Sequence, residues 1–224
     1  MSSVTEFIHF HPKCSVKPED PQNDEGQHLL QHFKNTKHQS GYISSAWGRA
    51  KEDENTIVWV VDWKDVHAGT QPSLLAPYLA PDTKVTVIFS TINPPISKTQ
   101  TFTLNPVTEL CALPFPSSLS PEEHRSLCER LANFRTALTE NLPAGSQPTS
   151  WAMGQLERPG TLPHENSPSG QAMVHLLAVG WPSVDAHIAI KQTKEFTDSI
   201  APIREKMLPP VAGLGMKHVS FQSV

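Results

Sequence analysis

The chain has 224 residues, 21 prolines, three cysteines and a formal net charge of −4 when histidines are counted as neutral. This length suits one large domain or two small ones with a proper core. No basic stripe appears, which argues against nucleic acid as a partner. The odd cysteine count and the lack of CxxC spacing argue against a disulfide framework or a structural zinc site.

The N-terminus lacks the basic region and the long apolar run of a signal peptide. No apolar stretch approaches the roughly 20 residues that span a bilayer. We therefore expect a soluble cytoplasmic protein without a membrane partner.

Apolar runs in the first part of the chain show strand patterns, at residues 5–11, 42–50, 56–63 and 84–92. Between the first two, Asn23 or Asp24 can cap a helix whose apolar face is Leu29, Leu30 and Phe33. Residues 65–80 include two prolines, so only a short, broken helix is expected there.

The pattern restarts after Pro94 and Pro95, which introduce a predicted linker at 96–105. Strands are predicted at residues 107–115, 149–156, 173–181 and 216–223. Ser120 begins a helix with a capping box, and Ser183 caps another that reaches about residue 196. Residues 157–171 are rich in Pro, Gly, Ser and Asn and are predicted to be a mobile loop near a pocket mouth.

The two parts of the chain match each other in element order. The matched positions are Val4-Thr5-Glu6 with Val107-Thr108-Glu109, Gly48 with Gly154, Trp63 with Trp181, and Phe89 with Phe221. The repeated order, strand–helix–strand–strand–helix–strand, is the ferredoxin-like unit. We expect an α+β fold of two such halves, residues 1–95 and 106–224, because each bare sheet face needs a cover that the other copy provides.

The βαββαβ repeat, the segment 180–187 (GWPSVDAH) and the closing segment 217–221 (KHVSF) resemble the dimeric α/β-barrel superfamily. Within it, the chain is similar to the antibiotic-biosynthesis-monooxygenase-like proteins of fungi, often tandem fused domains. The resemblance implies a barrel whose two sheets enclose an apolar pocket. It also implies a range of activities, from cofactor-free oxygenases, cyclases, decarboxylases and isomerases to stress-responsive proteins, so the fold does not fix the function.

Histidines on predicted strands are the candidate catalysts, because an imidazole in an apolar cavity can exchange a proton near neutral pH. His9 and His11 share one face of the first strand, and His175 shares the parity of its apolar neighbours. Val219 and Phe221 are expected to pack on the helices, which would place His218 inside the barrel. The alternative for each histidine is a hydrogen-bonded structural role. His187, in the helix after Trp181, is interpreted as a surface or supporting residue.

Three of these histidines, His9, His11 and His218, are also candidate metal ligands. His9 and His11 have the spacing of a metal pair, and His218 could be a third ligand. Because any strand with histidines at i and i+2 shows this spacing, we expect no metal. No nucleotide, phosphate-loop or nucleophile-elbow motif is present, so no organic cofactor is expected either.

Candidate ligand-binding residues are Trp47 or Trp151, one of which could stack on a flat ligand, and Arg49, which could bind a carboxylate or enolate. Ser220 and Gln222 share the face of His218 on the last strand. Core packing for the tryptophans and a solvated position for Arg49 are the alternatives.

Two functions remain open from the sequence. One is a cofactor-independent enzyme that performs acid/base chemistry on a hydrophobic polyketide- or terpenoid-like substrate, by cyclisation, isomerisation, decarboxylation or oxygenation. The other is a non-enzymatic small-molecule-binding or stress-responsive protein, which a filled core in place of the pocket would favour. Because each half covers the other, the chain is expected to be a monomer or, less simply, a homodimer.

Overall fold

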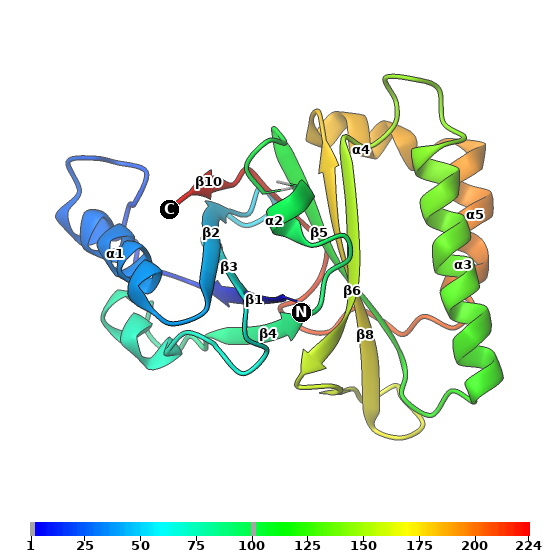
Figure 1. The fold of residues 1–224 in the computed structure, drawn as a ribbon, viewed down its shortest axis with the longest axis horizontal. Coiled ribbons are helices and arrows are strands. Elements are labelled where there is room, and N and C mark those ends of the chain that lie inside the picture. Colours follow the sequence, from blue (N-terminus) through cyan, green and yellow to red (C-terminus); the bar gives the residue numbers. More distant parts are fainter. Residues whose placement is uncertain (1–2, 100–101) are drawn as a thin grey trace.

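The computed structural model describes residues 3–99 and 102–224. The first half forms an antiparallel sheet in the order β2–β3–β1–β4. Its strands are β1 (Val4–Phe10), β2 (Tyr42–Arg49), β3 (Ile57–Trp63) and β4 (Thr86–Ser90). Helix α1 (Asp24–Asn35) continues into the 3-10 turn η1 (Thr36–His38), and with η2 (Pro72–Tyr78) it covers the outer face of this sheet (Figure 1).

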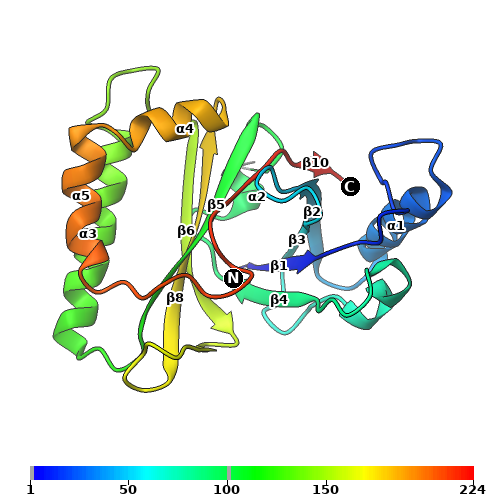
Figure 2. The same cartoon turned by 180° about the vertical axis from the view of Figure 1, so that it is seen from behind.

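The second half forms an antiparallel sheet in the order β6–β8–β5–β9. Its strands are β5 (Val107–Pro116), β6 (Ser150–Arg158), β8 (Gln171–Trp181) and β9 (Lys217–Val219), and the short β7 (Leu162–Pro163) pairs with β8. Helices α3 (Pro121–Thr139), α4 (Val184–Ile190) and α5 (Lys194–Arg204) lie on the outer side (Figures 1 and 2). Among the described residues, no helix has the length and apolar character that crossing a bilayer requires.

Two seams join the sheets. At the first, β4 pairs with β6; at the second, β10 (Gln222–Ser223) pairs with β2, and Ala50 bridges to Val219. A glycine lies at each seam: a β-carbon on Gly48 would approach the carbonyl oxygen of Ser220 to 2.5 Å, and one on Gly154 would approach that of Thr91 to 2.3 Å. The chain therefore curls into a dimeric-type α/β barrel made from two ferredoxin-like halves, and the predicted α+β fold is confirmed.

The register of the strands matches between the halves. Val4 pairs with Trp63 across β1 and β3, and Val107 pairs with Trp181 across β5 and β8. The last strand departs from the predicted match: Glu6 faces Phe89, whereas Glu109 faces His218. The counterpart of Phe89 is therefore His218 and not Phe221. An odd-numbered shift of register reverses the faces of a strand, so this difference decides where every side chain of β9 points.

The core has three layers. Two outer layers lie between each sheet and its helices, and the central layer lies between the sheets. The central layer includes Phe7, Val60, Leu176, Val219 and Phe221, all buried. These side chains fill much of the space where an apolar pocket was expected, so the barrel interior is packed at its centre.

The local signals in the sequence account for most element boundaries. The capping box of Ser120 and Glu123 forms as predicted at the start of α3, and Asn23 caps α1. The helix expected after Ser183 is divided instead, because Thr193 caps a new helix, α5. The predicted linker is not a free connection, since it contains the short α2 (Ile96–Thr99) and sends Phe102 into the central layer. The domain limits themselves remain a prediction.

Candidate functional site

An apolar cavity of about 120 Å³ lies in the outer layer of the second half, between the sheet and helices α3, α4 and α5. Strand residues Trp151 and Leu177 form one wall, and Phe134, Phe196 and Ile200 from the helices form the other. Ordinary ligand pockets measure about 300–1,000 Å³, so this cavity suits a compact ligand.

Glu109 is the one carboxylate among the residues that line this cavity. Its position on β5 alternates with Leu110, which faces the central layer, so the carboxyl group points to the helices. The side chain is buried, and Trp181 Nε1 donates a hydrogen bond of 3.0 Å to its Oε2. Burial raises the pKa of Glu109, although the Trp181 hydrogen bond and the nearby charges of His218 and Lys191 oppose that rise.

His187 reaches the same carboxyl group from α4. Ser183 caps this helix and fixes its first turn, which places the imidazole flat against the Trp181 indole, with ring centroids 4.8 Å apart and planes at 9°. His187 Nε2 lies 3.3 Å from Glu109 Oε2. The ring is 2% exposed, and burial lowers its pKa to about 3, so His187 is neutral at pH 7 and lies in close polar contact with the Glu109 carboxyl group.

His218 continues this contact toward the surface. Its Nε2 lies 2.7 Å from His187 Nδ1, and its Nδ1 forms a hydrogen bond with Glu52 Oε1. The backbone N–H of His218 also donates to Glu52 Oε2, at 2.9 Å. Burial by itself would raise the pKa of Glu52, but the hydrogen bonds from His218 outweigh it and hold that pKa below its ordinary value. The Glu52 side chain is 38% exposed, so this end of the chain meets solvent.

The four side chains form a continuous path of polar contacts, Glu109–His187–His218–Glu52, which we name the relay. Hydrogen bonds join His187 to His218 and His218 to Glu52, and a 3.3 Å contact joins Glu109 to His187. The relay fits two proton arrangements with the same total. In one, Glu109 is ionised and His218 carries protons on both nitrogens; in the other, Glu109 is protonated and both imidazoles are neutral. Moving one proton along each of the contacts between Glu109 and His218 converts one arrangement into the other. The relay can therefore carry a proton between the cavity and the surface.

Both halves of the chain build the relay. Glu52 comes from the turn between β2 and β3, which the backbone hydrogen bond from Lys51 N to His218 O (2.8 Å) holds against β9. Glu109, His187 and His218 come from β5, α4 and β9 of the second half. Without the first half, the relay would lose its surface end.

The first half contains a related arrangement with different contacts. Trp63 Nε1 donates to Glu6 Oε2 at 2.8 Å, as Trp181 does to Glu109. In place of a histidine, Thr70 contacts Glu6, with its backbone N–H at 2.9 Å and its hydroxyl at 2.8 Å. Glu6 is therefore satisfied by fixed donors that hold no mobile proton at neutral pH, and the Glu–Trp pair is a shared structural feature of the two halves.

The predicted position of His218 is wrong, although the residue itself is part of the site. Val219 and Phe221 face the central layer, which leaves His218 on the helix side. The period of two was correct, but the barrel interior proved to be as apolar as the space under the helices, so polarity alone could not choose the side. His187, predicted to be a surface or supporting residue, is buried and central to the relay.

The other predicted histidines lie elsewhere. His175 is on the helix side of β8, near Phe115 and His124, and it does not meet His218 among the described contacts. His9 lies at one end of the barrel beside a cavity of about 470 Å³, which Glu52 also lines. The exposed His11 lies 3.6 Å from Asp53. No group of three potential metal ligands occurs within residues 3–99 and 102–224, and the expectation of no metal stays a prediction.

Of the predicted ligand-binding residues, Trp151 lines the cavity. Trp47 instead packs against Phe33 of α1, on the outer side of the first half. Arg49 forms an ion pair of 2.7 Å with Glu19.

The last two predicted ligand-binding residues belong to the closing segment. Ser220 donates to the carbonyl of Pro106, and Gln222 is exposed on β10. A binding role for either has no cavity to support it in the described residues.

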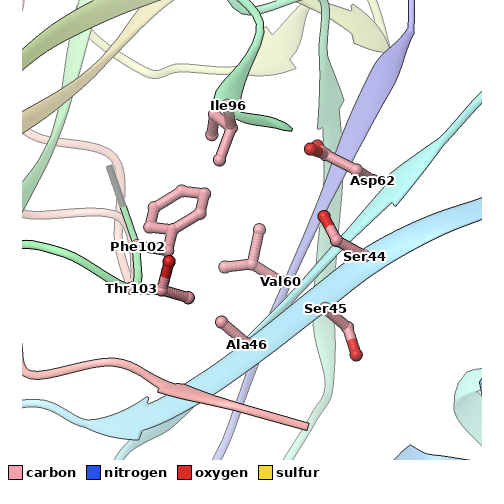
Figure 3. Close-up of a pocket in the computed structure, with 8 residues that line it drawn as sticks. All are labelled: Ser44, Ser45, Ala46, Val60, Asp62, Ile96, Phe102 and Thr103. Atoms are coloured by element: carbon pink, nitrogen blue, oxygen red, sulfur yellow. The ribbon is translucent and has the colours of Figure 1, made fainter. Parts of the chain in front are cut away.

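A third cavity, of about 280 Å³, opens at the end of the barrel interior in the first half (Figure 3). Ile96 and Phe102 close one side, and Ser44 and Asp62 lie on the other (Figure 3). Asp62 accepts a hydrogen bond of 2.6 Å from Thr5, and both are buried. The predicted interior pocket is therefore reduced to this space at the barrel end.

The loop at 157–171, predicted to be mobile from its composition, forms several hydrogen bonds within itself and with neighbouring residues. His164 N donates to Gly170 O at 3.0 Å, Ser167 donates to Gln171, and His164 Nε2 lies 2.9 Å from Pro209 O. None of its residues lines the Glu109 cavity. Its mobility stays a prediction, but a lid role at this cavity is not supported.

Sequence reasoning missed Glu109 and Glu52. The signal for Glu109 was the Val-Thr-Glu triplet, which places a carboxylate inside an apolar strand in both halves of the chain. No comparable signal marks Glu52, which sits in a turn with several other acidic residues.

Comparison with known proteins shows which solved structures share this fold. No protein-family model matches the sequence, and no curated protein matches it. Solved structures do match. An anthrone oxidase-like protein aligns over 100% of this chain and 92% of its own, with a TM-score of 0.54 and 12% identity. The chain has the dimeric α/β-barrel fold.

Two further solved structures agree. A Fusobacterium nucleatum protein described as a "putative monooxygenase" covers 99% of this chain, and 92% of its own length aligns, at a TM-score of 0.54 and 13% identity. A protein described as a "putative chlorite dismutase" gives a TM-score of 0.58 at 9% identity, over 99% of this chain and 95% of its own. At these identities the likeness shows the fold alone.

Proposed function

We propose that this protein is a cofactor-independent enzyme that moves protons on a hydrophobic small molecule bound between the sheet and helices of its second half. The observation that carries the proposal is the relay. It joins Glu109, in the wall of an apolar cavity, to Glu52 at the surface through two buried imidazoles. A buried path of polar side chains in contact is what repeated proton transfer at a dry site requires.

In the proposed reaction, Glu109 is the general base. Its carboxylate removes a proton from an acidic C–H of the substrate, which leaves a carbanion or enolate in the cavity. His187 and His218 then pass a proton outward, and Glu52 exchanges it with water. The apolar walls, including Trp151 and Phe134, hold the substrate in place and exclude water.

The fate of the enolate decides the reaction class. Protonation at another carbon gives isomerisation, attack on an internal carbonyl gives cyclisation, and reaction of the carbanion with molecular oxygen gives oxygenation; decarboxylation forms the same kind of carbanion. The resemblance to antibiotic-biosynthesis-monooxygenase-like proteins favours a polyketide- or terpenoid-like substrate. Because similar solved structures are described as a putative monooxygenase and an anthrone oxidase-like protein, we would test oxygenation first among these reactions.

Deuterium exchange tests the proposal without knowledge of the product. The protein would be incubated in D₂O with compact carbon acids such as cyclopentanone and cyclohexanone, which suit a cavity of about 120 Å³, and deuterium at carbon would be followed by NMR. Wild-type protein should accelerate exchange for at least one of them. Glu109→Gln should slow that exchange by about 10²-fold or more, because general bases contribute 10²–10⁴-fold. A folded Glu109→Gln protein with full exchange activity would contradict the role of Glu109.

The second candidate function is non-enzymatic binding of a small molecule. The packed centre of the barrel and the small volume of the Glu109 cavity favour it. Under this hypothesis, the protein would bind carbon acids without accelerating their exchange, and Glu109→Gln would change affinity alone.

A further inference from the structure

Two cations that line the Glu109 cavity, Lys191 and Arg204, form no ion pair with a carboxylate among the described residues. Lys191 follows α4 as its C-cap, and its ammonium group lies 3.6 Å from the sulfur of Met216. A thioether sulfur is only a weak acceptor, so this contact leaves most of the hydrogen-bonding capacity of the ammonium group unused.

Arg204 stands out from the charged residues beside it. The next two residues of the chain are paired: Glu205 binds Arg130 at 2.9 Å, and Lys206 binds Glu123 at 2.9 Å. Arg204 lines the cavity and is exposed, and no ion pair or side-chain hydrogen bond of it occurs in the described part of the chain. The guanidinium group is therefore available to a carboxylate, which it can bind through two parallel hydrogen bonds.

Two cations and one carboxylate, Glu109, are the charged groups among the residues that line this otherwise apolar cavity. Lys191 lines the same cavity as Glu109 and His187, and its charge acts against the raised pKa of Glu109.

We propose that the cavity takes an organic monoanion with a flat apolar body, whose carboxylate or enolate oxygen binds Lys191 and Arg204. This inference rests on the proposed function, because it names the substrate class of the same site. A cation beside the general base would also stabilise the negative charge that develops when the substrate loses its proton.

Binding of two nearly isosteric probes of a size that suits the cavity tests the inference: benzoate, an anion, and benzamide, which is neutral. Isothermal titration calorimetry at pH 7.5 should show that wild-type protein binds benzoate about 10-fold more tightly or better, as expected for charge-assisted hydrogen bonds. The variants Lys191→Gln and Arg204→Gln should each reduce this preference, and the double variant should remove it.

Lys194→Gln is the matched control. Lys194 lies on α5, is highly exposed and pairs with Asp198 at 3.0 Å, away from the residues that line the cavity. This variant should keep the full preference for the anion. Equal affinity of wild-type protein for both probes, no binding of either probe, or an unchanged preference in the double variant would overturn the inference.

Glu109→Gln separates this inference from the proposed function. If the variant prefers benzoate but wild-type protein exchanges no carbon acid, the anion site stands and the enzymatic proposal fails. If wild-type protein exchanges neutral carbon acids as fast as anionic ones and shows no preference between the probes, the enzymatic proposal stands and the anion site fails.

Discussion

Glu109 and His218 lie directly opposite each other across the pair of β5 and β9, and both reach the imidazole of His187. The two strands thus hold Glu109 and His218 at a fixed spacing, and α4 places His187 between them. Because a strand pair is a rigid frame, this geometry needs no ligand to form.

The first prediction concerns His218. Replacement by Ala should lower the free energy of unfolding by about 1–3 kcal/mol, because His187 Nδ1 and Glu52 lose their partner. It should also slow deuterium exchange at carbon, since the proton on Glu109 loses its route to water. Urea unfolding and the exchange assay measure the two effects separately. Full exchange activity per folded molecule would show that His218 is structural only.

The second prediction concerns the surface end of the relay. Glu52→Gln should change the free energy of unfolding little, because Glu52 is partly exposed, but it should slow exchange and increase the solvent isotope effect on turnover. Glu54→Gln is the control, because its exposed side chain lies outside the relay and Arg49 contacts only its backbone carbonyl. Equal effects of the two variants would contradict a specific role of Glu52.

The third prediction compares the two related glutamates. Glu6→Gln should destabilise the protein by about 1–3 kcal/mol, because the amide cannot accept the hydrogen bonds from Thr70 and Trp63 as the carboxylate does. It should leave carbon-acid exchange unchanged, unlike Glu109→Gln. Loss of exchange in folded Glu6→Gln protein would indicate that the chemistry takes place in the first half and would contradict the role of Glu109.

The fourth prediction is a loss of stability in mild acid. Burial lowers the pKa of His9 to about 3 and that of His175 to about 4. Below the ordinary histidine pKa of about 6.5 the unfolded chain therefore binds protons that the folded chain does not. The free energy of unfolding should fall by up to about 2 kcal/mol per buried histidine between pH 6.5 and pH 5.

Glu109 acts in the opposite direction, because a raised pKa favours the folded state at low pH and loses that advantage as the pH rises. Glu109 therefore changes the free energy of unfolding at pH values above the ordinary carboxyl pKa. In that range its contribution partly offsets the loss of stability that the histidines cause in acid. Urea unfolding at pH 7.5, 6.5 and 5 measures the sum, and His175→Leu should flatten the slope. A stability that stays constant over this range would contradict the burial of these rings.

The fifth prediction concerns the seam between the halves. Gly154→Ala should cost about 1–3 kcal/mol or more, because the new methyl group would collide with the backbone of Thr91. Gly160→Ala is the control, since its nearest neighbour would lie at 3.6 Å, an ordinary contact. If the seams replace a partner subunit, sedimentation velocity should show wild-type protein as a monomer.

Sequence patterns were enough to predict the order of strands and helices, several caps and the equivalence of Trp63 with Trp181. These features depend on local periodicity and on short-range hydrogen bonds, which neighbouring residues specify. The barrel was then predicted from the resemblance of this element order to a known superfamily.

The side of the last strand that faces the helices could not be predicted from the sequence and is known from the tertiary structure alone. Both sides of β9 meet apolar surroundings, so the pattern Lys217–Val219 is compatible with either orientation. The turn that carries Glu52 reaches His218 across more than a hundred residues of chain, a contact that no local signal encodes. The site therefore depends on how the two halves close on each other, because barrel closure brings the Glu52 turn to the terminal strand.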